Sequence, residues 1–179
     1  MISRINRSVG LNARRMMNSN AQRAFANKNA EEITLGQPTH MSNSEAFVEQ
    51  MVAHGVTDTF GIVGSAFMDA LDLWPGAGIR FISVAHEQNA THMADGYARA
   101  SGKHGVCIAQ NGPGISNFFT GVAAAYWAHS PVVCVTPEAG TMTKGHGGFQ
   151  ELDQIPVFSA VTKFQAHVNN PARMSELTA

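Results

Sequence analysis

The chain lacks any apolar run that approaches the roughly 18 residues of a membrane-spanning helix. Basic side chains are also scarce over most of its length, because residues 31–179 contain six Lys and Arg against thirteen Asp and Glu. This acidic body offers no basic patch of the kind that binds nucleic acid. We therefore expect neither a membrane span nor a nucleic-acid partner.

The motifs of three common kinds of site are missing as well. The stretch "HEQNATH", residues 86–92, has Ala90 where the HExxH zinc motif requires its second His, and the eight His residues show no ligand spacing. There is no GxxxxGK[ST] phosphate loop, and "GPGISN" has Asn117 where a dinucleotide fingerprint requires Gly. The sequence therefore predicts no metal site, no P-loop and no dinucleotide site.

Cysteine is limited to Cys107 and Cys134, and each lies within a short apolar run. Such positions are typical of small buried side chains in reduced surroundings. We expect neither a disulfide nor a metal pair from them.

The composition divides the chain into three parts. Residues 1–30 contain six basic and no acidic side chains, together with Ser and Asn, which is typical of a mitochondrial transit peptide. A disordered extension of a cytoplasmic protein is the alternative. Residues 31–40 are expected to be a linker, and residues 41–179 are long enough to form one domain with a core of its own.

From residue 41 the chain alternates between helical and strand patterns. Ser42 and Glu45 form a capping-box signature for a helix that stops at Gly55. Helices placed between short strands indicate an α/β fold, with a parallel sheet flanked by helices on both faces. The expected strands cover residues 57–63, 79–85, 104–110 and 131–137, with 160–168 as a candidate for a further strand. The further helices cover 64–74 (closed by Pro75-Gly76), 85–103 and 112–130.

The C-terminal part is expected to contain a Gly-rich loop over residues 138–154 with a short helix, and then a last helix. Asn170 suits the cap of that last helix and Pro171 its first position. A fold of this type returns to the sheet after such a helix. We therefore expect residues 41–179 to be a domain truncated at its C-terminus.

Three loops should meet at one edge of the sheet, because the carboxyl ends of parallel strands lie together and bind ligands there. These loops are "FGIVGS", "AHE" and "QNGPGISN". Their residues Gly61, Gly64, Gly112 and Gly114 would let a flat ligand approach the backbone. Tight strand-to-helix turns are the alternative explanation for each of these glycines.

Glu87 stands out because helical projection places it on a face of small residues that includes Ala90, Ala94 and Ala98. The helix dipole favours an acid in the first turn without any further function. If the small-residue face is buried, however, an unpaired carboxylate is costly there and needs a partner that can share a proton. A ring nitrogen of a ligand would serve, and the small residues would let a flat ring approach.

The expected helix from residue 113 to 128 is apolar around most of its circumference, which predicts burial on nearly all sides. A central core helix and a subunit interface are both consistent with this pattern. The residues concerned are Phe118, Phe119, Val122, Ala123, Ala125, Tyr126 and Trp127.

At these residues the chain resembles the pyrimidine-binding domain of thiamine-diphosphate-dependent enzymes, the family of acetolactate synthase and pyruvate decarboxylase. The matching stretches, in the family's order, are "FGIVGSA", "HEQNATHMADGYARASGK", "GPGISNFFTGVAAAYWAHSPVV" and "GGFQELD". The resemblance implies that the cofactor is thiamine diphosphate. It also implies that Glu87 hydrogen-bonds N1′ of the aminopyrimidine and so promotes loss of the proton from C2 of the thiazolium.

The same matching implies roles for other site residues. Gly112, Pro113, Gly114 and Asn117 would line the pyrimidine and substrate side, Gly64 and Ser65 would flank the mouth of the site, and Gln150 would reach toward a small-molecule substrate. In this family the domain faces the diphosphate-binding domain of another subunit, so the resemblance implies a homodimer or homotetramer.

Within the family, the stretches around Thr136-Pro137 look most like the sulfoacetaldehyde acetyltransferase group, which converts sulfoacetaldehyde and phosphate to acetyl phosphate and sulfite. Relatives usually carry an aliphatic residue and Thr-Gly at the place of "TPE". The alternatives are an acetolactate synthase, a 2-oxoacid decarboxylase such as sulfopyruvate decarboxylase, and a non-catalytic interaction module.

One family motif is absent from this sequence. The Gly-Asp-Gly motif, whose downstream Asn helps to hold Mg²⁺ and diphosphate, has no better counterpart than Ala94-Asp95-Gly96 inside a helix. We therefore expect the Mg²⁺ ligands in a diphosphate-binding domain, supplied by another subunit or by a missing C-terminal part. The chain would then be a fragment of a longer enzyme or one subunit of a split enzyme.

Overall fold

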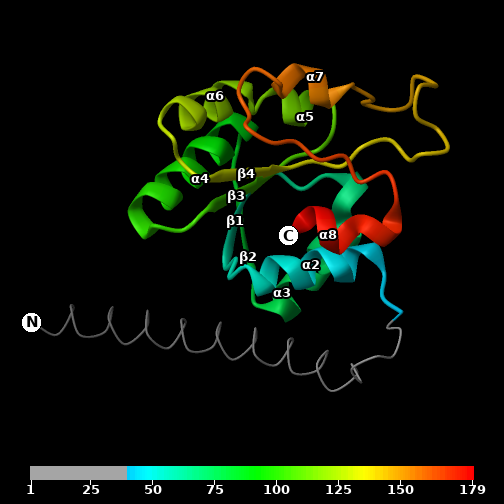
Figure 1. The fold of residues 1–179 in the computed structure, drawn as a ribbon, viewed down its shortest axis with the longest axis horizontal. Coiled ribbons are helices and arrows are strands. Elements are labelled where there is room, and N and C mark those ends of the chain that lie inside the picture. Colours follow the sequence, from blue (N-terminus) through cyan, green and yellow to red (C-terminus); the bar gives the residue numbers. More distant parts are fainter. Residues whose placement is uncertain (1–39) are drawn as a thin grey trace, which may run out of the picture.

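A parallel four-stranded sheet forms the centre of the computed structural model, which describes residues 40–179 (Figure 1). The transit-peptide-like extension and nearly all of the expected linker lie outside the described residues. The strands are β1 (Asp58–Gly61), β2 (Arg80–Ser83), β3 (Gly105–Ile108) and β4 (Val132–Val135), and their order across the sheet is β2-β1-β3-β4.

Helices cover both faces of this sheet. On one face, α2 (Asn43–Ala53) and α3 (Met68–Ala77) pack over a core that includes Trp74, Val106 and Ile108. On the other face, α4 (Glu87–Ser101) and α6 (Phe119–Trp127) pack over a core that includes Phe60, Cys107 and Phe118. The predicted α/β fold with helices on both faces is confirmed. The shorter elements are η1 (Ser65–Phe67), α5 (Pro113–Ser116), α7 (Gln154–Phe158), η2 (Pro171–Arg173) and α8 (Met174–Thr178).

Two helix starts follow from local capping chemistry, as predicted. At the start of α2, Glu45 N–H donates to Ser42 Oγ at 3.2 Å, and Ser42 N–H donates to Glu45 Oε2 at 2.7 Å. At the start of η2, Ala172 N–H donates to Asn170 Oδ1 at 3.1 Å. Each cap provides acceptors for helix-end N–H groups that have no partner within the helix.

Two of the predicted helix boundaries are wrong. The helix that Pro75-Gly76 was expected to close continues through Pro75 to Ala77 and ends at Gly78, whose φ is 73°. Ala77 is fully buried, so burial of the last turn stabilises the helix by more than the one backbone hydrogen bond that proline cannot donate would contribute. The helix expected over residues 112–130 is divided into α5 and α6, because Phe118 N–H bonds Ile115 O at 2.9 Å and tightens the turn between them.

The strand expected over residues 160–168 does not form in the structure. Thr162 Oγ1 and Val161 N–H both donate to Phe158 O, so this stretch begins as turns that follow α7. Phe164, in the middle of this stretch, is 72% exposed, so the stretch does not pack into the sheet as a strand would.

Helix α6 is buried on one side only, which corrects the expectation of burial on nearly all sides. Phe118, Val122 and Ala125 are in the core, whereas Tyr126 is 39% and Trp127 77% exposed. Since the rest of the helix surface is largely exposed and includes aromatic side chains, a central core helix is wrong, and burial of this surface at a subunit interface stays a prediction. In residues 40–179, no helix has the length and apolar character needed to cross a membrane.

Close packing of α4 against its neighbours depends on glycine. A Cβ at Gly121 of α6 would lie 1.7 Å from Thr91 Oγ1, and a Cβ at Gly105 of β3 would lie 2.0 Å from Ala94 O. Thr91 is fully buried, and its hydroxyl donates to Gln88 O at 2.8 Å, which fixes its rotamer. The small residues therefore let α4 lie directly against β3 and α6.

We predict that Gly121→Ala lowers the free energy of unfolding by about 1–3 kcal/mol, because the added methyl overlaps Thr91. Gly96→Ala is the matched control: it is also in a helix, but nothing lies within 4 Å of the added methyl. Helix propensity should make that control more stable by about 1 kcal/mol. Urea unfolding measures both changes, and equal stability of the two variants would contradict the close contact.

Candidate functional site

The strand order places a topological switch point between β1 and β3. The chain leaves β1 toward β2 on one side, and β3 and β4 lie on the other. In open α/β sheets, ligands bind beyond the carboxyl ends of the strands at such a point. The loops after β1, β2 and β3 carry seven of the nine predicted site residues to this edge. Gly61 is instead the last residue of β1, where a Cβ would lie 2.1 Å from Ile108 O of β3.

Gln110 connects the loops after β1 and β3. Ala66 N–H donates to its Oε1 at 3.3 Å, and a Cβ at Gly64 would lie 2.2 Å from the same oxygen. A Cβ at Gly114 would lie 3.3 Å from Gln110 Cβ. Gly64 therefore lets the two loops meet, while Ser65 begins η1 with an exposed side chain.

Glu87 is the first residue of α4, and its carboxylate faces the turn after β3. Asn117 Nδ2 donates to Glu87 Oε2 at 2.9 Å. A Cβ at Gly114 would lie 3.6 Å from Glu87 Oε1, in van der Waals contact, so the glycine borders this oxygen without a side chain. Three residues predicted separately from the sequence thus form one cluster, with the exposed Pro113 at the start of α5 next to it.

The alanine face of α4 does not provide the space expected for a ligand ring. Ala90 and Ala94 are fully buried in the core between the sheet and helices α5 and α6. They serve helix packing, and the residue that borders the Glu87 carboxylate without a side chain is Gly114. Glu87 itself is half-buried at the start of α4.

Gly112 and Gln150 meet, although they are far apart in the sequence. Gly112 has φ 65° and ψ −112°, and a Cβ there would lie 2.4 Å from Gln150 O. Asn111 Nδ2 donates to the same carbonyl at 2.8 Å and to Phe149 O at 3.4 Å. Gln150 has φ 57°, a left-handed conformation that is uncommon for a residue with a side chain.

Asn111 was missed by the sequence reasoning. It is 3% exposed, and its Oδ1 has no hydrogen-bond partner among the described residues. Its partners are carbonyl groups 38 and 39 residues away, so no local pattern could have identified it. A buried amide oxygen without a partner is uncommon in proteins, and this one lies beside the Gly112 turn.

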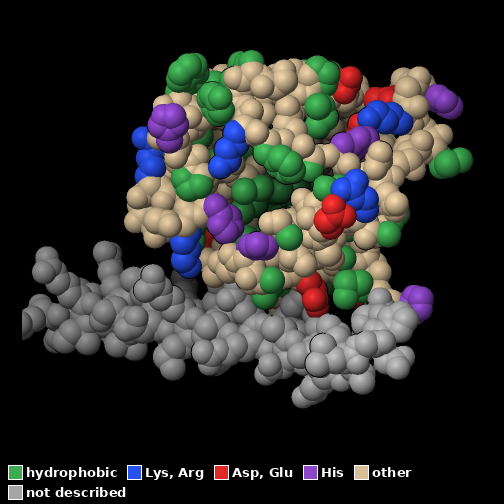
Figure 2. Space-filling view, in the orientation of Figure 1, with side chains coloured by type: hydrophobic (Ala, Val, Ile, Leu, Met, Phe, Trp, Pro, Cys, Tyr) green, Lys and Arg blue, Asp and Glu red, His purple; other side chains and the backbone are tan. Residues whose placement is uncertain are grey.

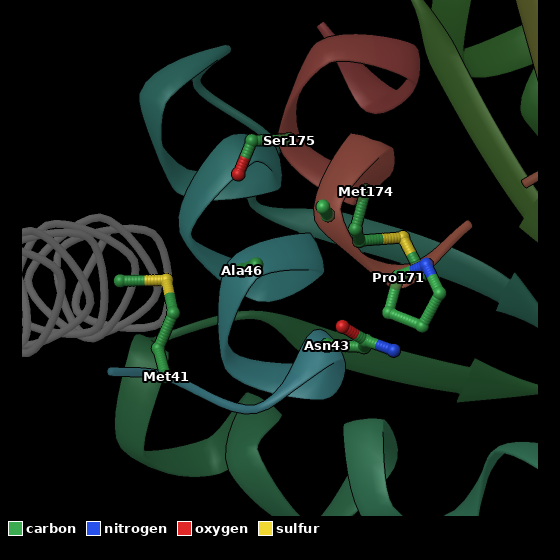
Figure 3. Close-up of a pocket in the computed structure, with 7 residues that line it drawn as sticks. Met41, Asn43, Ala46, Pro171, Met174 and Ser175 are labelled. Atoms are coloured by element: carbon green, nitrogen blue, oxygen red, sulfur yellow. The ribbon is translucent and has the colours of Figure 1, made fainter. Parts of the chain in front are cut away.

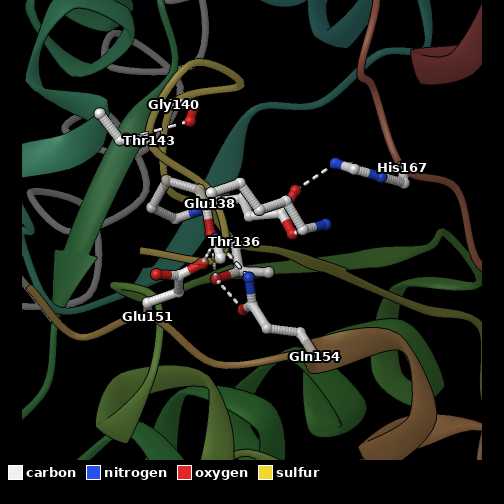
Figure 4. A network of polar contacts seen from close by, with 10 residues as sticks. Thr136, Glu138, Gly140, Thr143, Glu151, Gln154 and His167 are labelled. Carbon is white, nitrogen blue, oxygen red and sulfur yellow. Dashed lines mark hydrogen bonds and ion pairs between the residues drawn. The ribbon is translucent and has the colours of Figure 1, made fainter. Parts of the chain in front are cut away.

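A polar network holds the loop that carries Gln150 (Figure 4). At one end, Thr136 Oγ1 donates to Gln154 Oε1 at 2.9 Å and Gln154 Nε2 donates to Pro137 O at 2.9 Å. Farther along, Glu138 pairs with Lys144 at 2.5 Å and contacts His167. The pairing raises the pKa of Lys144.

Glu151 forms a second anchor within the same loop. Its carboxylate accepts hydrogen bonds from the backbone N–H groups of Gly145 and Gly148, the latter at 2.8 Å. These donors lower the pKa of Glu151, because they stabilise the charged form.

Two cavities of the described chain lie elsewhere. One, of about 410 Å³, lies between the start of α2 and the C-terminal helices and is lined by Asn43, Pro171 and Met174 (Figure 3). The other, of about 230 Å³, is an apolar hollow over β3 and β4 that includes Val106 and Val133 (Figure 2). Neither is lined by a predicted site residue. The Glu87 cluster lies at an edge where Pro113 and Asn117 are exposed, which a second domain could cover.

Comparison with known proteins agrees with this geometry. Residues 41–157 match the family described as "Thiamine pyrophosphate enzyme, N-terminal TPP binding domain". The chain is 68% identical over 138 residues to a sulfoacetaldehyde acetyltransferase of Alcaligenes xylosoxydans xylosoxydans, covering 77% of this chain and 23% of that protein. A sulfoacetaldehyde acetyltransferase of Rhodobacter capsulatus is 50% identical over 137 residues, with coverage of 76% and 23%.

More distant relatives have a different name. A probable acetolactate synthase large subunit of Methanocaldococcus jannaschii is 38% identical over 136 residues, which cover 76% of this chain and 23% of that protein. The chain thus spans less than a quarter of the length of these relatives.

We predict that Asn111→Ala loosens the loop around Gln150, because two carbonyl groups lose their donor. The lost bonds correspond to about 1–2 kcal/mol of local stability. Hydrogen–deuterium exchange should therefore accelerate over residues 145–154, and Asn169→Ala, at an exposed position, is the control. Unchanged exchange in this loop would show that Asn111 does not hold it.

We predict that the loop anchor at Glu151 weakens in acid. The folded pKa lies below the ordinary value of 4.5, so the anchor's contribution is complete above that value and is lost as the pH falls through the lowered pKa. The amide proton shifts of Gly145 and Gly148 should titrate with this lowered midpoint and should not titrate in Glu151→Gln. A midpoint at or above 4.5 would contradict the two backbone bonds.

Proposed function

Since this chain belongs to the family of thiamine pyrophosphate enzymes and contains their N-terminal TPP-binding domain, we propose that Glu87 binds the aminopyrimidine ring of thiamine diphosphate and shares a proton with its N1′. The observation that carries the proposal is the Glu87 carboxylate beside Gly114, with one oxygen held by Asn117 at 2.9 Å. The second oxygen, Oε1, accepts no hydrogen bond from the described residues and lies next to Gly114, where a Cβ would be 3.6 Å away.

The residues at this edge suit such a ring. A side chain at Gly114 would enter the space next to Glu87 Oε1, so the glycine there keeps room for a flat group. The half-buried Glu87 carboxylate has one oxygen held by Asn117, which leaves the other as an acceptor or donor for a ring nitrogen. An amino-substituted pyrimidine has both a ring nitrogen and an amine with which to use such groups.

When bound, thiamine diphosphate supplies a carbon nucleophile that protein side chains do not have. The residues of this chain would bind and orient it. Asn117 would hold the Glu87 carboxylate in one orientation, and Glu87 would hold the shared proton at the ring nitrogen. Gly114 would border the ring, Gly112 would let the loop of Gln150 pack against the turn after β3, and that Asn111-anchored loop would place Gln150 on the substrate side.

The diphosphate group and Mg²⁺ need other ligands. Within residues 40–179, no group of three or more His, Cys, Asp or Glu residues could hold a metal ion. We assign the Mg²⁺ and diphosphate ligands to a separate diphosphate-binding domain, contributed by a second subunit of a homodimer or homotetramer. The open edge at Glu87 is the surface that this domain would cover.

We further propose that the complete enzyme acts as a sulfoacetaldehyde acetyltransferase, converting sulfoacetaldehyde and phosphate to acetyl phosphate and sulfite. Relatives that are 68% and 66% identical to this chain have that name. The Thr136-Pro137 pair, which first indicated this group, is fixed by Gln154 at the start of the loop that carries Gln150.

A chimaera tests the proposal, with residues 41–179 joined to the remaining length of the Alcaligenes relative. We predict that it forms sulfite and acetyl phosphate from sulfoacetaldehyde and phosphate. Glu87→Gln should slow exchange of the cofactor's C2 proton by about 10²–10⁴-fold, because the amide cannot take up the shared proton. Glu49→Gln makes the same chemical change on α2, away from the site, and should leave the exchange unchanged.

Near-normal exchange in Glu87→Gln would overturn the role of this carboxylate. In a second assay that supplies pyruvate in place of sulfoacetaldehyde and phosphate, acetolactate formation without any sulfite release in the first assay would support the acetolactate synthase alternative. If the chain forms a stable mixed oligomer with a full-length relative, and the activity of that oligomer is independent of Glu87, the non-catalytic module is the better description.

A further inference from the structure

The two cysteines of the chain lie side by side on neighbouring strands. Cys107 of β3 and Cys134 of β4 are register partners in the parallel sheet. Their Sγ atoms are 3.4 Å apart, in hydrogen-bonding contact. Sequence reasoning predicted two unrelated buried thiols, because nothing in the separate apolar runs indicates that they are in register.

This arrangement is close to the geometry of a disulfide. Register partners on adjacent strands have Cα atoms about 5 Å apart, within the range of about 4.4–6.8 Å found across disulfides. Their side chains project to the same face of the sheet, so both sulfur atoms already point into one space. Side-chain rotation could shorten the 3.4 Å separation without moving the strands apart.

The two thiols differ in accessibility. Cys107 is fully buried, and burial together with the neighbouring Cys134 thiol raises its pKa. Cys134 is half-buried on β4, which is the edge strand of the described sheet. An oxidant from solvent therefore reaches Cys134 first, and Cys107 is the thiol positioned to attack the product.

We propose that Cys107 and Cys134 form a redox-active pair that hydrogen peroxide converts to an intrachain disulfide. In the first step, the Cys134 sulfur attacks one peroxide oxygen, the O–O bond breaks, and the products are a sulfenic acid and water. In the second step, the Cys107 sulfur attacks the Cys134 sulfur, the S–O bond breaks, and a second water leaves with the Cys107 proton. The two thiols are oxidised by two electrons, and the peroxide is reduced to two waters.

The position of the pair gives the bond a structural consequence. β3 leads into the turn with Gly112 and Gly114, and β4 leads into the loop that Gln154 and Asn111 anchor. A disulfide would therefore lock the two strands directly below both segments of the candidate site. The proposal itself rests on the register and the sulfur separation and does not depend on the identity of the cofactor.

The test is peroxide treatment of the protein, blocking of remaining thiols with N-ethylmaleimide, and mass spectrometry without reductant. The sequence has no Lys or Arg between residues 104 and 143, so trypsin leaves both cysteines in one peptide. We expect this peptide to lose the mass of two hydrogen atoms and to take up no N-ethylmaleimide. Further cleavage by chymotrypsin after Phe119 and Tyr126 should give two peptides that separate only on reduction.

Two variants test the order of the steps. Cys107→Ser should leave Cys134 as a sulfenic acid that dimedone traps, and Cys134→Ser should leave Cys107 unmodified. The proposal is overturned if the oxidised wild-type protein carries N-ethylmaleimide on both cysteines or links them only between chains. The wild-type measurement decides this by itself if a variant fails to fold.

Discussion

The parallel alignment of the four strands is the constraint on which the candidate site depends. Because β1, β2 and β3 point the same way, the turns that follow them open at one edge of the sheet. Helix α4 therefore begins beside the turn that contains Gly112 and Gly114, and Asn117 reaches Glu87 from that turn. The site is built from helix starts and tight turns on a rigid sheet, and it is exposed on one side.

Close packing below this edge sets the position of the carboxylate. Gly105 and Gly121 let α4 lie directly against β3 and α6, and Thr91 is buried at the contact. A larger residue at either glycine would move the helix whose first residue is Glu87. Packing in the core and placement of the functional group are thus parts of one constraint, although no packing residue is itself in the site.

The sequence was sufficient where the signal is local. The caps at Ser42 and Asn170, the α/β alternation and the cluster of Glu87, Gly114 and Asn117 were all predictable, since turns after parallel strands must meet. The roles of Asn111 and Gln154 were not, because their partners come from distant parts of the chain. Pro75 and the stretch 160–168 were misjudged because tertiary packing and turn hydrogen bonds outweighed local preference.

The central claim is that Glu87 contributes a proton-sharing contact to a cofactor held mainly by another domain. The most direct measurement is the ¹⁵N NMR shift of N1′ in labelled thiamine diphosphate bound to the chimaera that joins this domain to the rest of the Alcaligenes relative. The account predicts a shift toward the protonated, hydrogen-bonded ring in the wild-type chimaera and a signal close to that of free cofactor in Glu87→Gln. An identical N1′ shift in both proteins would contradict it.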